Sequence, residues 1–74
     1  MTAVRIDAKE REFYRRIGAR IRQARQSRGW TQLQLSMRLE MTQVALHHYE
    51  NGVNRPTLYR LRQIEKATGQ EIVL

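Results

Sequence analysis

Helix start and stop signals divide this chain into short helical segments, and the positions of these signals limit the possible folds more than any other feature of the sequence. An Asp or Thr followed three residues later by Glu or Gln forms a capping box that opens a helix, and glycine favours its end. The sequence has openings at Asp7 with Glu10, at Thr31 with Gln34 and at Thr42, and glycine stops at Gly29, Gly52 and Gly69. These signals predict helices over about residues 7–27, 31–39, 42–51 and 57–68.

Apolar side chains recur at helical spacing within these segments, so the core should form where their apolar faces meet. The residues predicted to point inward are Phe13, Tyr14, Ile17, Ile21, Ala24, Trp30, Leu35, Leu39, Leu58, Leu61, Ile64 and Ala67. The predicted fold class is all-α. We interpret residues 1–6 as a loose N-terminal arm and residues 7–69 as one domain. Residues 70–74 form a tail that is either a strand or an arm.

The charge balance favours an anionic polymer as the partner. Fourteen Lys and Arg residues oppose seven Asp and Glu residues, the net charge is +7, and twelve of the basic residues are arginine. Arginine presents a planar fork that suits phosphate, although a GC-rich genome also enriches a chain in arginine. There is no cysteine, and no apolar run approaches the roughly 20 residues of a membrane helix or the core of a signal peptide. We therefore expect a cytoplasmic protein.

The segment TQVALHHYENG, residues 42–52, has two chemically different sides. At about 100° per residue, one side of its helix carries the residues expected to be buried, which are Ala45, Leu46 and Tyr49. The other side carries Gln43, Val44, His47, His48 and Asn51. A solvated face would usually carry Lys and Glu. Amides that pair with adenine and apolar groups that contact the thymine methyl are instead typical of a surface that recognises base edges in DNA.

Metal binding and catalysis fit this segment less well. His47 and His48 are adjacent and point about 100° apart, so they cannot chelate one ion as an i, i+4 pair would. The nearby acid Glu50 points to another side, and the sequence has no cysteine and no evident Ser–His–acid or paired-carboxylate arrangement. We expect no enzyme, no metal and no cofactor.

The order of these elements resembles the lambda-repressor-like helix-turn-helix domain, also called the Cro/C1 or XRE type. The resemblance covers residues 18–69. It rests on Arg-Gly-Trp-Thr-Gln at 28–32, Leu-x-x-x-Leu at 35–39, the cap with Glu-Asn-Gly at 42–52, and Arg-Pro-x-Leu at 55–58. It implies a bundle of four to five helices in which residues 43–51 lie in the major groove of double-stranded DNA.

The resemblance also implies roles for individual residues. Base-reading positions match Gln43, Val44 and His48, with His47 as a weaker candidate. Phosphate-contacting positions match Gln32, Thr42, Asn51 and Arg55. Arg25 and Glu50 match an ion pair that joins the first helix to the end of the recognition helix. Plainer alternatives remain: Arg25 as another phosphate ligand, Gln32 as a helix-start residue, and a solvated surface for Val44 and the histidines.

Four residues depart from the family pattern. Glu40 stands where the turn usually has glycine, and Ser36 replaces a small alanine at the contact between two helices. Glu65 and Thr68 stand where Ala and Leu usually help to bury the last helix. These last two predict a weaker core at that helix, and the chain has no residues left for the usual fifth helix.

Three functions follow as alternatives. The first is a sequence-specific transcription regulator, usually a repressor in this family, that binds an inverted-repeat operator as a homodimer. The second is an antitoxin that binds a toxin and autoregulates its operon, with residues 71–74 pairing as a strand with a second copy or a partner unless this end is frayed. The third is RNA binding by the arginine-rich first helix, which lacks the aromatic stacking surface that single-stranded RNA recognition usually needs, because Phe13 and Tyr14 are predicted to lie in the core.

Overall fold

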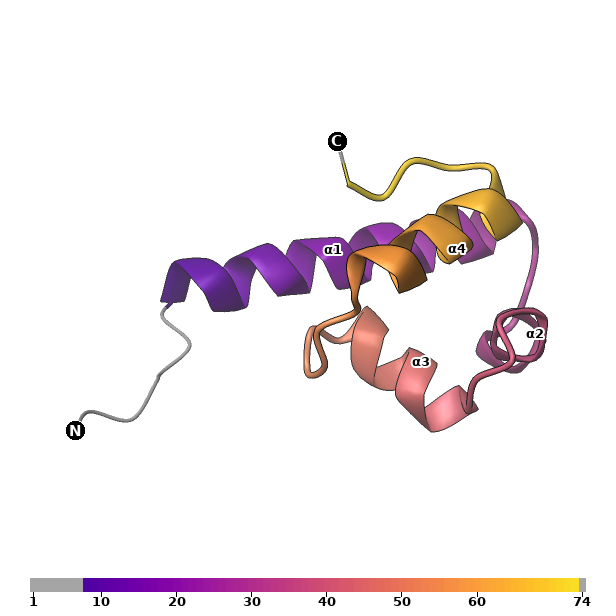
Figure 1. Ribbon diagram of the computed structural model, residues 1–74, viewed down its shortest axis with the longest axis horizontal. Coiled ribbons are helices and arrows are strands. Elements are labelled where there is room, and N and C mark those ends of the chain that lie inside the picture. Colours follow the sequence, from indigo (N-terminus) through magenta and orange to yellow (C-terminus); the bar gives the residue numbers. More distant parts are fainter. Residues whose placement is uncertain (1–7, 74) are drawn as a thin grey trace.

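A 20-residue helix, α1 (Ala8–Ser27), is the longest element, and α4 runs beside it while α2 and α3 lie below it in the view of Figure 1. They are α2 (Gln32–Arg38), α3 (Gln43–Glu50) and α4 (Leu58–Thr68). The computed structural model describes residues 8–73, and within this range it contains four helices and no strand. The all-α prediction is therefore confirmed. The predicted arm at residues 1–6 and the predicted cap at Asp7 lie outside the described residues.

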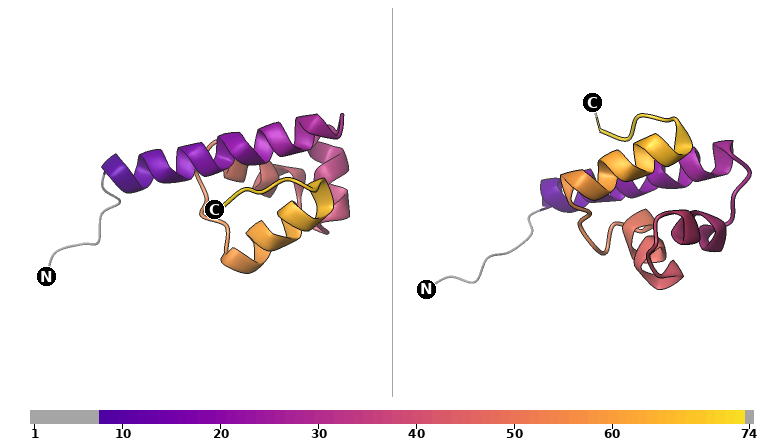
Figure 2. Two further views of the ribbon diagram at one scale, coloured as in Figure 1. Left: turned by 90° about the horizontal axis from the view of Figure 1, so that it is seen from above. Right: turned by 45° about the vertical axis from the view of Figure 1, so that its right-hand side comes forward.

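The core lies under the middle and C-terminal part of α1. Its buried apolar side chains are Ile17, Ile21, Ala24, Leu35, Leu39, Leu46, Leu61, Ile64 and Ile72. Helix α1 packs on α3 and α4, and α2 packs on α3. The first turns of α1 project beyond the other helices, as two further views show (Figure 2). The first buried position on α1 is accordingly Ile17.

Two residues predicted to point inward are exposed, so these predictions are wrong. Phe13 is 51% exposed because it precedes Ile17, where burial on α1 begins, and its ring packs edge-to-face on Tyr14 at 5.1 Å between centroids. Leu58 is 63% exposed because it is the first residue of α4, next to the capping residue Thr57. Helical spacing identifies a face of a helix but does not say how far along that face a partner extends.

The caps that open α2 and α3 lie where the sequence predicts them. The hydroxyl of Thr31 accepts a hydrogen bond from the N–H of Gln34, whose side chain accepts one from the N–H of Thr31. The hydroxyl of Thr42 accepts one from the N–H of Ala45. Between these helices, Glu40 adopts a φ of 54°. The turn therefore keeps the left-handed conformation that favours glycine, although its residue carries a Cβ.

The tail folds back onto its own domain and is not a strand. Oε2 of Glu65 accepts hydrogen bonds from the N–H groups of Ile72 and Val73 at 2.8 and 3.2 Å, and the guanidinium of Arg20 donates to the carbonyl of Ile72 at 3.1 Å. Ile72 is completely buried, and the tail runs between α1 and α4 (Figure 2). Residues 70–73 therefore form no strand within the described chain and are not frayed, whereas pairing of the tail with a second copy or a partner stays a prediction.

The polar residues of α4 do not leave a gap in the core. Thr68 is buried, donates from its hydroxyl to the carbonyl of Ile64 at 2.8 Å and accepts from the N–H of Gln70 at 3.3 Å. Glu65 binds the tail that carries Ile72 into the core. Two departures from the family pattern, Glu65 and Thr68, thus bind a tail segment that adds Ile72 to the core, and a weaker core at α4 stays a prediction.

Candidate nucleic-acid interface

Helix α3 presents two different sides, as its sequence pattern predicts. Leu46 is completely buried, and Tyr49 packs against the core. On the other side, Gln43 and His47 are exposed, and Val44 is 64% exposed. The cap from Thr42 fixes the first turn of this helix, so these side chains leave the domain from a rigid backbone.

A close backbone contact between α1 and α3 sets the orientation of α3. Gly18 lies in the middle of α1, and a Cβ at this position would overlap the carbonyl groups of Tyr49 and Glu50. Glycine inside a helix costs about 0.5–1 kcal/mol relative to alanine. Here it allows the C-terminal end of α3 to lie directly on the backbone of α1.

Beside this contact, Arg25 and Glu50 form a buried ion pair. Nε and Nη2 of Arg25 donate to Oε2 and Oε1 of Glu50 at 2.7 and 2.9 Å, and the side chain of Glu50 is fully buried. Burial acts to raise the pKa of Glu50. The hydrogen bonds from Arg25 and Gln32 outweigh that effect, so this pKa lies below its ordinary value. The hydrogen bond to Glu50 raises the pKa of Arg25. Both groups therefore remain charged at neutral pH.

Gln32, at the start of α2, also binds this ion pair. Its Nε2 donates to Oε1 of Glu50 at 3.1 Å and lies 3.4 Å from Nδ1 of His47. The side chain therefore joins α2 to the end of α3 from a half-buried position. A contact between Gln32 and a phosphate stays a prediction.

The end of α3 carries a further polar cluster. Nδ2 of Asn51 donates to the carbonyl of His47 at 2.8 Å, and Oδ1 of Asn51 accepts from Nη2 of Arg22 at 3.4 Å. His48 is half-buried, and its carbonyl accepts from the N–H of Val53 at 2.9 Å. The two histidine rings lie 6.1 Å apart between centroids, and in residues 8–73 no three His, Asp or Glu residues gather as a metal site would require.

Arg55, in the loop after α3, is bound back to α1. Its Nη1 lies 2.8 Å from Oε1 of Glu10, and its guanidinium lies over the ring of Tyr14 at 5.4 Å. The sequence-predicted residues thus converge on one side of the domain, around α3 and the loop that follows it. Gln43, Val44 and His47 are exposed there, whereas Arg25 and Glu50 lie beneath.

A comparison with known families agrees with this arrangement. The profile of the HTH_3 helix-turn-helix family matches residues 21–73. The chain belongs to the Cro/C1-type helix-turn-helix family, also called XRE. This is a family of DNA-binding transcription regulators that are typically not enzymes. No curated protein matches the chain significantly. None of the helices described for this Cro/C1-type domain is long and apolar enough to cross a membrane.

Sequence reasoning missed three residues that position the interface of this Cro/C1-type domain. Gly18 carries a local signal, since an isolated glycine within a helical pattern often marks a close approach of backbones. Arg22 lies one helical turn before Arg25 and so falls on the same face of α1. Glu10 matches only a capping box in the local pattern, and its contact with Arg55 joins residues too far apart in sequence for such a pattern to predict.

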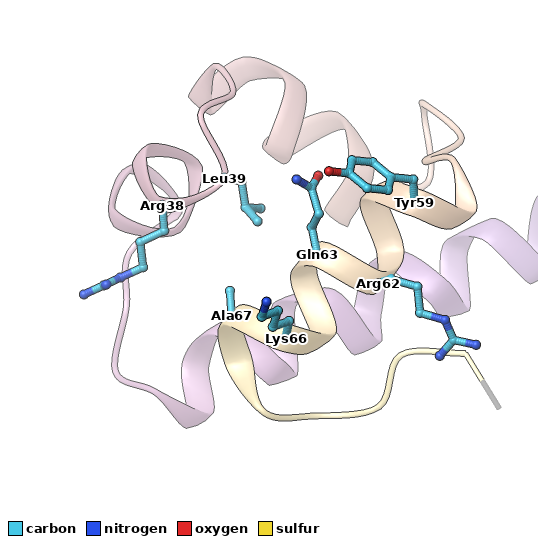
Figure 3. Close-up of a pocket in the computed structure, with 7 residues that line it drawn as sticks. All are labelled: Arg38, Leu39, Tyr59, Arg62, Gln63, Lys66 and Ala67. Atoms are coloured by element: carbon cyan, nitrogen blue, oxygen red, sulfur yellow. The ribbon is translucent and has the colours of Figure 1, made fainter.

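A groove of about 440 Å³ lies elsewhere on the Cro/C1-type domain, between the end of α2 and α4 (Figure 3). The side chains that line it are Arg38, Leu39, Tyr59, Arg62, Gln63, Lys66 and Ala67. None of the residues predicted to contact DNA is among them. Oε1 of Gln63 is buried there and has no hydrogen-bond partner among residues 8–73. The groove combines an apolar floor with basic side chains at its edge.

Proposed function

We propose that the protein is a sequence-specific regulator of transcription that inserts α3 into the major groove of double-stranded DNA. The exposed face of α3 carries the proposal. This face displays an amide at Gln43, an apolar group at Val44 and an imidazole at His47, all free of the charged side chains of an ordinary solvated helix. A helix of this kind fits the width of the major groove, where these groups meet base edges.

In this proposal, Gln43 and Val44 at the start of α3 contact bases most deeply, and His47 and His48 contact bases one turn later. An amide at Gln43 suits adenine, which offers one acceptor and one donor in the major groove, and Val44 suits a thymine methyl group. The buried residues Leu46 and Glu50 hold the helix at the depth that these contacts require.

The phosphate backbone is bound by residues at both ends of the recognition helix. Thr42 caps its start. At the other end, Gln32 lies beside Glu50, and Asn51 and Arg55 follow the helix. Arg55 exchanges its partner Glu10 for a phosphate oxygen when DNA is bound. Because phosphate contacts carry no sequence information, these residues set the register of the protein and supply salt-dependent affinity.

The active form is proposed to be a homodimer on an inverted repeat, and repression by occlusion of a promoter is the expected outcome. One recognition helix covers only about 4–6 base pairs, so two copies about one helical turn apart are needed for useful specificity. Residues 70–74 are a candidate contact between the copies. The backbone of Ile72 and Val73 is already bound within the domain, so such a contact would use side chains.

Selection of binding sites from random duplex DNA, followed by gel-shift assays, tests this function. We expect enrichment of a palindrome whose half-sites lie about 10 base pairs apart from centre to centre. A variant with Gln43→Ala and Val44→Ala, checked for folding by circular dichroism, should lose the enriched site but keep weak binding to any duplex. Recovery of no palindromic site at any salt concentration would exclude the proposal.

An antitoxin is the second candidate, and the groove between α2 and α4 supports it. Its apolar floor at Leu39 and Ala67 and its basic edge lie away from α3, so a bound protein would leave the DNA-binding face accessible. Co-expression with the product of the adjacent gene, followed by size-exclusion chromatography, tests this candidate. Separate elution of the two proteins would exclude it.

A further inference from the structure

A row of arginines on α1 runs beside the C-terminal end of α3. At about 100° per residue, Arg11, Arg15 and Arg22 fall within an arc of about 80° that also contains Gly18 and Arg25. This face of α1 therefore continues from the buried pair at Arg25 towards the projecting first turns of the helix. All these residues belong to the same continuous helix, so their spacing in the sequence determines that they share one face.

Two backbone contacts fix this row beside the candidate interface. Gly18 lies against the carbonyl groups of Tyr49 and Glu50 at the end of α3. A Cβ on Gly52, in the loop after α3, would lie 2.9 Å from the Cα of Arg15. Arg15 therefore lies directly against the loop that leads to Arg55.

The side chain of Arg22 reaches the polar cluster at the end of α3. Its Nη2 donates to Oδ1 of Asn51 at 3.4 Å, and its Nε lies 3.5 Å from Oε1 of Glu50. The side chain is 45% exposed. Arginine has five N–H donors, so Arg22 can keep its bond to Asn51 and still present donors to solvent.

These contacts differ from those of the arginines that hold the fold together. Arg28 and Arg60 donate to the carbonyls of Thr68 and Leu39 at 2.8 and 2.9 Å. Arg15, by contrast, has a 67% exposed side chain whose ion pair with Glu12 measures 3.8 Å. Long contacts between exposed side chains contribute little to stability and exchange readily for another anion.

From this placement we propose that Arg15 and Arg22 bind backbone phosphates of the DNA that flanks the α3 site. The inference rests on the proposed function and extends its interface along α1, past the end of the recognition helix. In each protomer, each of these two arginines neutralises one phosphate of the DNA. Because phosphates are the same in every sequence, this contact raises the affinity for all duplexes and leaves the preference for the operator unchanged.

The test compares Arg15→Gln and Arg22→Gln with Arg16→Gln. Arg16 is a matched control because it is the next residue on α1, carries the same charge, contacts the same Glu12 at 3.3 Å and points about 100° away from Arg15. Fluorescence anisotropy would give the affinity for the selected operator and for a scrambled duplex over a range of salt concentrations. Circular dichroism would first show that each variant is folded.

Affinity decreases as salt rises, so the slope of log affinity against log salt is negative. We expect this slope to become shallower by about 0.9 for each arginine lost at the interface. The operator and the scrambled duplex should show the same change, and Arg16→Gln should keep the slope of the unchanged protein. Equal slopes for all three variants would overturn the inference while leaving the proposed function intact. A loss of operator preference without a change of slope would also overturn it, since these residues would then act through α3. Failure of the unchanged protein to bind any duplex would overturn the proposed function as well.

Discussion

Arg25 and Glu50 are joined by two hydrogen bonds, at 2.7 and 2.9 Å, across the contact between α1 and α3. A third donor of the same guanidinium binds the carbonyl of Trp30 at 2.9 Å, just before α2. One side chain therefore joins all the helices that present the candidate interface. Because Glu50 is buried, this arrangement is stable only while both charges are present.

Replacement of Arg25 by alanine should lower the free energy of unfolding by about 3–5 kcal/mol, because it leaves a buried carboxylate without its partner. Urea unfolding followed by the fluorescence of Trp30 would measure this loss. Arg16→Ala is the control, since its exposed pair with Glu12 is worth at most about 1 kcal/mol. Equal losses for the two variants would show that the buried pair does not stabilise the domain.

The stability of the domain should fall in acid. Burial acts to raise the pKa of Glu50, but hydrogen bonds from Arg25 and Gln32 hold it below the ordinary value of 4.5. The N–H of Ile72 and the guanidinium of Arg62 lower the pKa of Glu65. The unfolded chain therefore binds more protons than the folded chain once the pH falls towards 4.5. The stabilisation is complete above this pH and is lost as the pH drops through the lower, folded-state values.

Urea unfolding at a series of pH values between about 6 and 3 would measure this effect. Glu65→Gln removes one of the two groups, so the free energy of unfolding of this variant should depend less steeply on pH. Glu71→Gln changes an exposed glutamate in the tail and should keep the full dependence. A Glu65→Gln protein with an unchanged dependence on pH would contradict the role of this carboxylate.

The features that the sequence predicts correctly depend on neighbouring residues. Caps such as Thr31 with Gln34 act within one helical turn, and the two sides of α3 follow from a fixed rotation per residue. Burial is predicted less successfully, because it depends on which other element packs against a given part of a helix. Phe13 has the correct spacing for a core residue, but burial on α1 begins only at Ile17, one turn further along the helix.

The roles of the arginines are also not predictable from local sequence patterns. A net charge of +7 suggests phosphate binding, but it does not distinguish an arginine that binds DNA from one that holds a carbonyl of its own chain. Within residues 8–73, the arginines at positions 20, 25, 28 and 60 donate to backbone carbonyls. Those carbonyls lie 5 to 52 residues away in sequence, so three-dimensional contacts are needed to assign the roles.

Truncation of the buried side chain in the tail should destabilise the domain. Ile72 is completely inaccessible to solvent, and replacement of a buried isoleucine by alanine costs about 2–5 kcal/mol. Urea unfolding of Ile72→Ala would measure the loss, with Glu71→Ala as the exposed neighbour that should lose little. If Ile72→Ala unfolds like the unchanged protein but has a different molecular mass in solution, the tail serves a partner and not its own domain.

Glycine at position 40 should stabilise the domain. Glu40 has a φ of 54°, a conformation that costs a residue with a Cβ about 1–2 kcal/mol. Glycine relieves this strain but loses more entropy on folding, so the net gain in the free energy of unfolding should be about 0.5–1 kcal/mol. Gln23→Gly, at an exposed site inside α1, should instead lose about 1 kcal/mol. A loss in both variants would show that the turn tolerates Glu40 without strain.

Base-reading and phosphate-binding residues should separate in their effects on DNA binding. Gln43→Ala should weaken binding to the selected operator by about 1–3 kcal/mol and relax the preference at one base pair, because an amide then no longer meets a base edge. Arg55→Ala should weaken binding to every duplex and lower the salt dependence, because it removes a charge near the phosphates. Anisotropy titrations on the operator, on single-base variants of it and on a scrambled duplex would distinguish the two patterns. The assignment of roles would be wrong if Gln43→Ala weakened all these duplexes equally, as Arg55→Ala is expected to do.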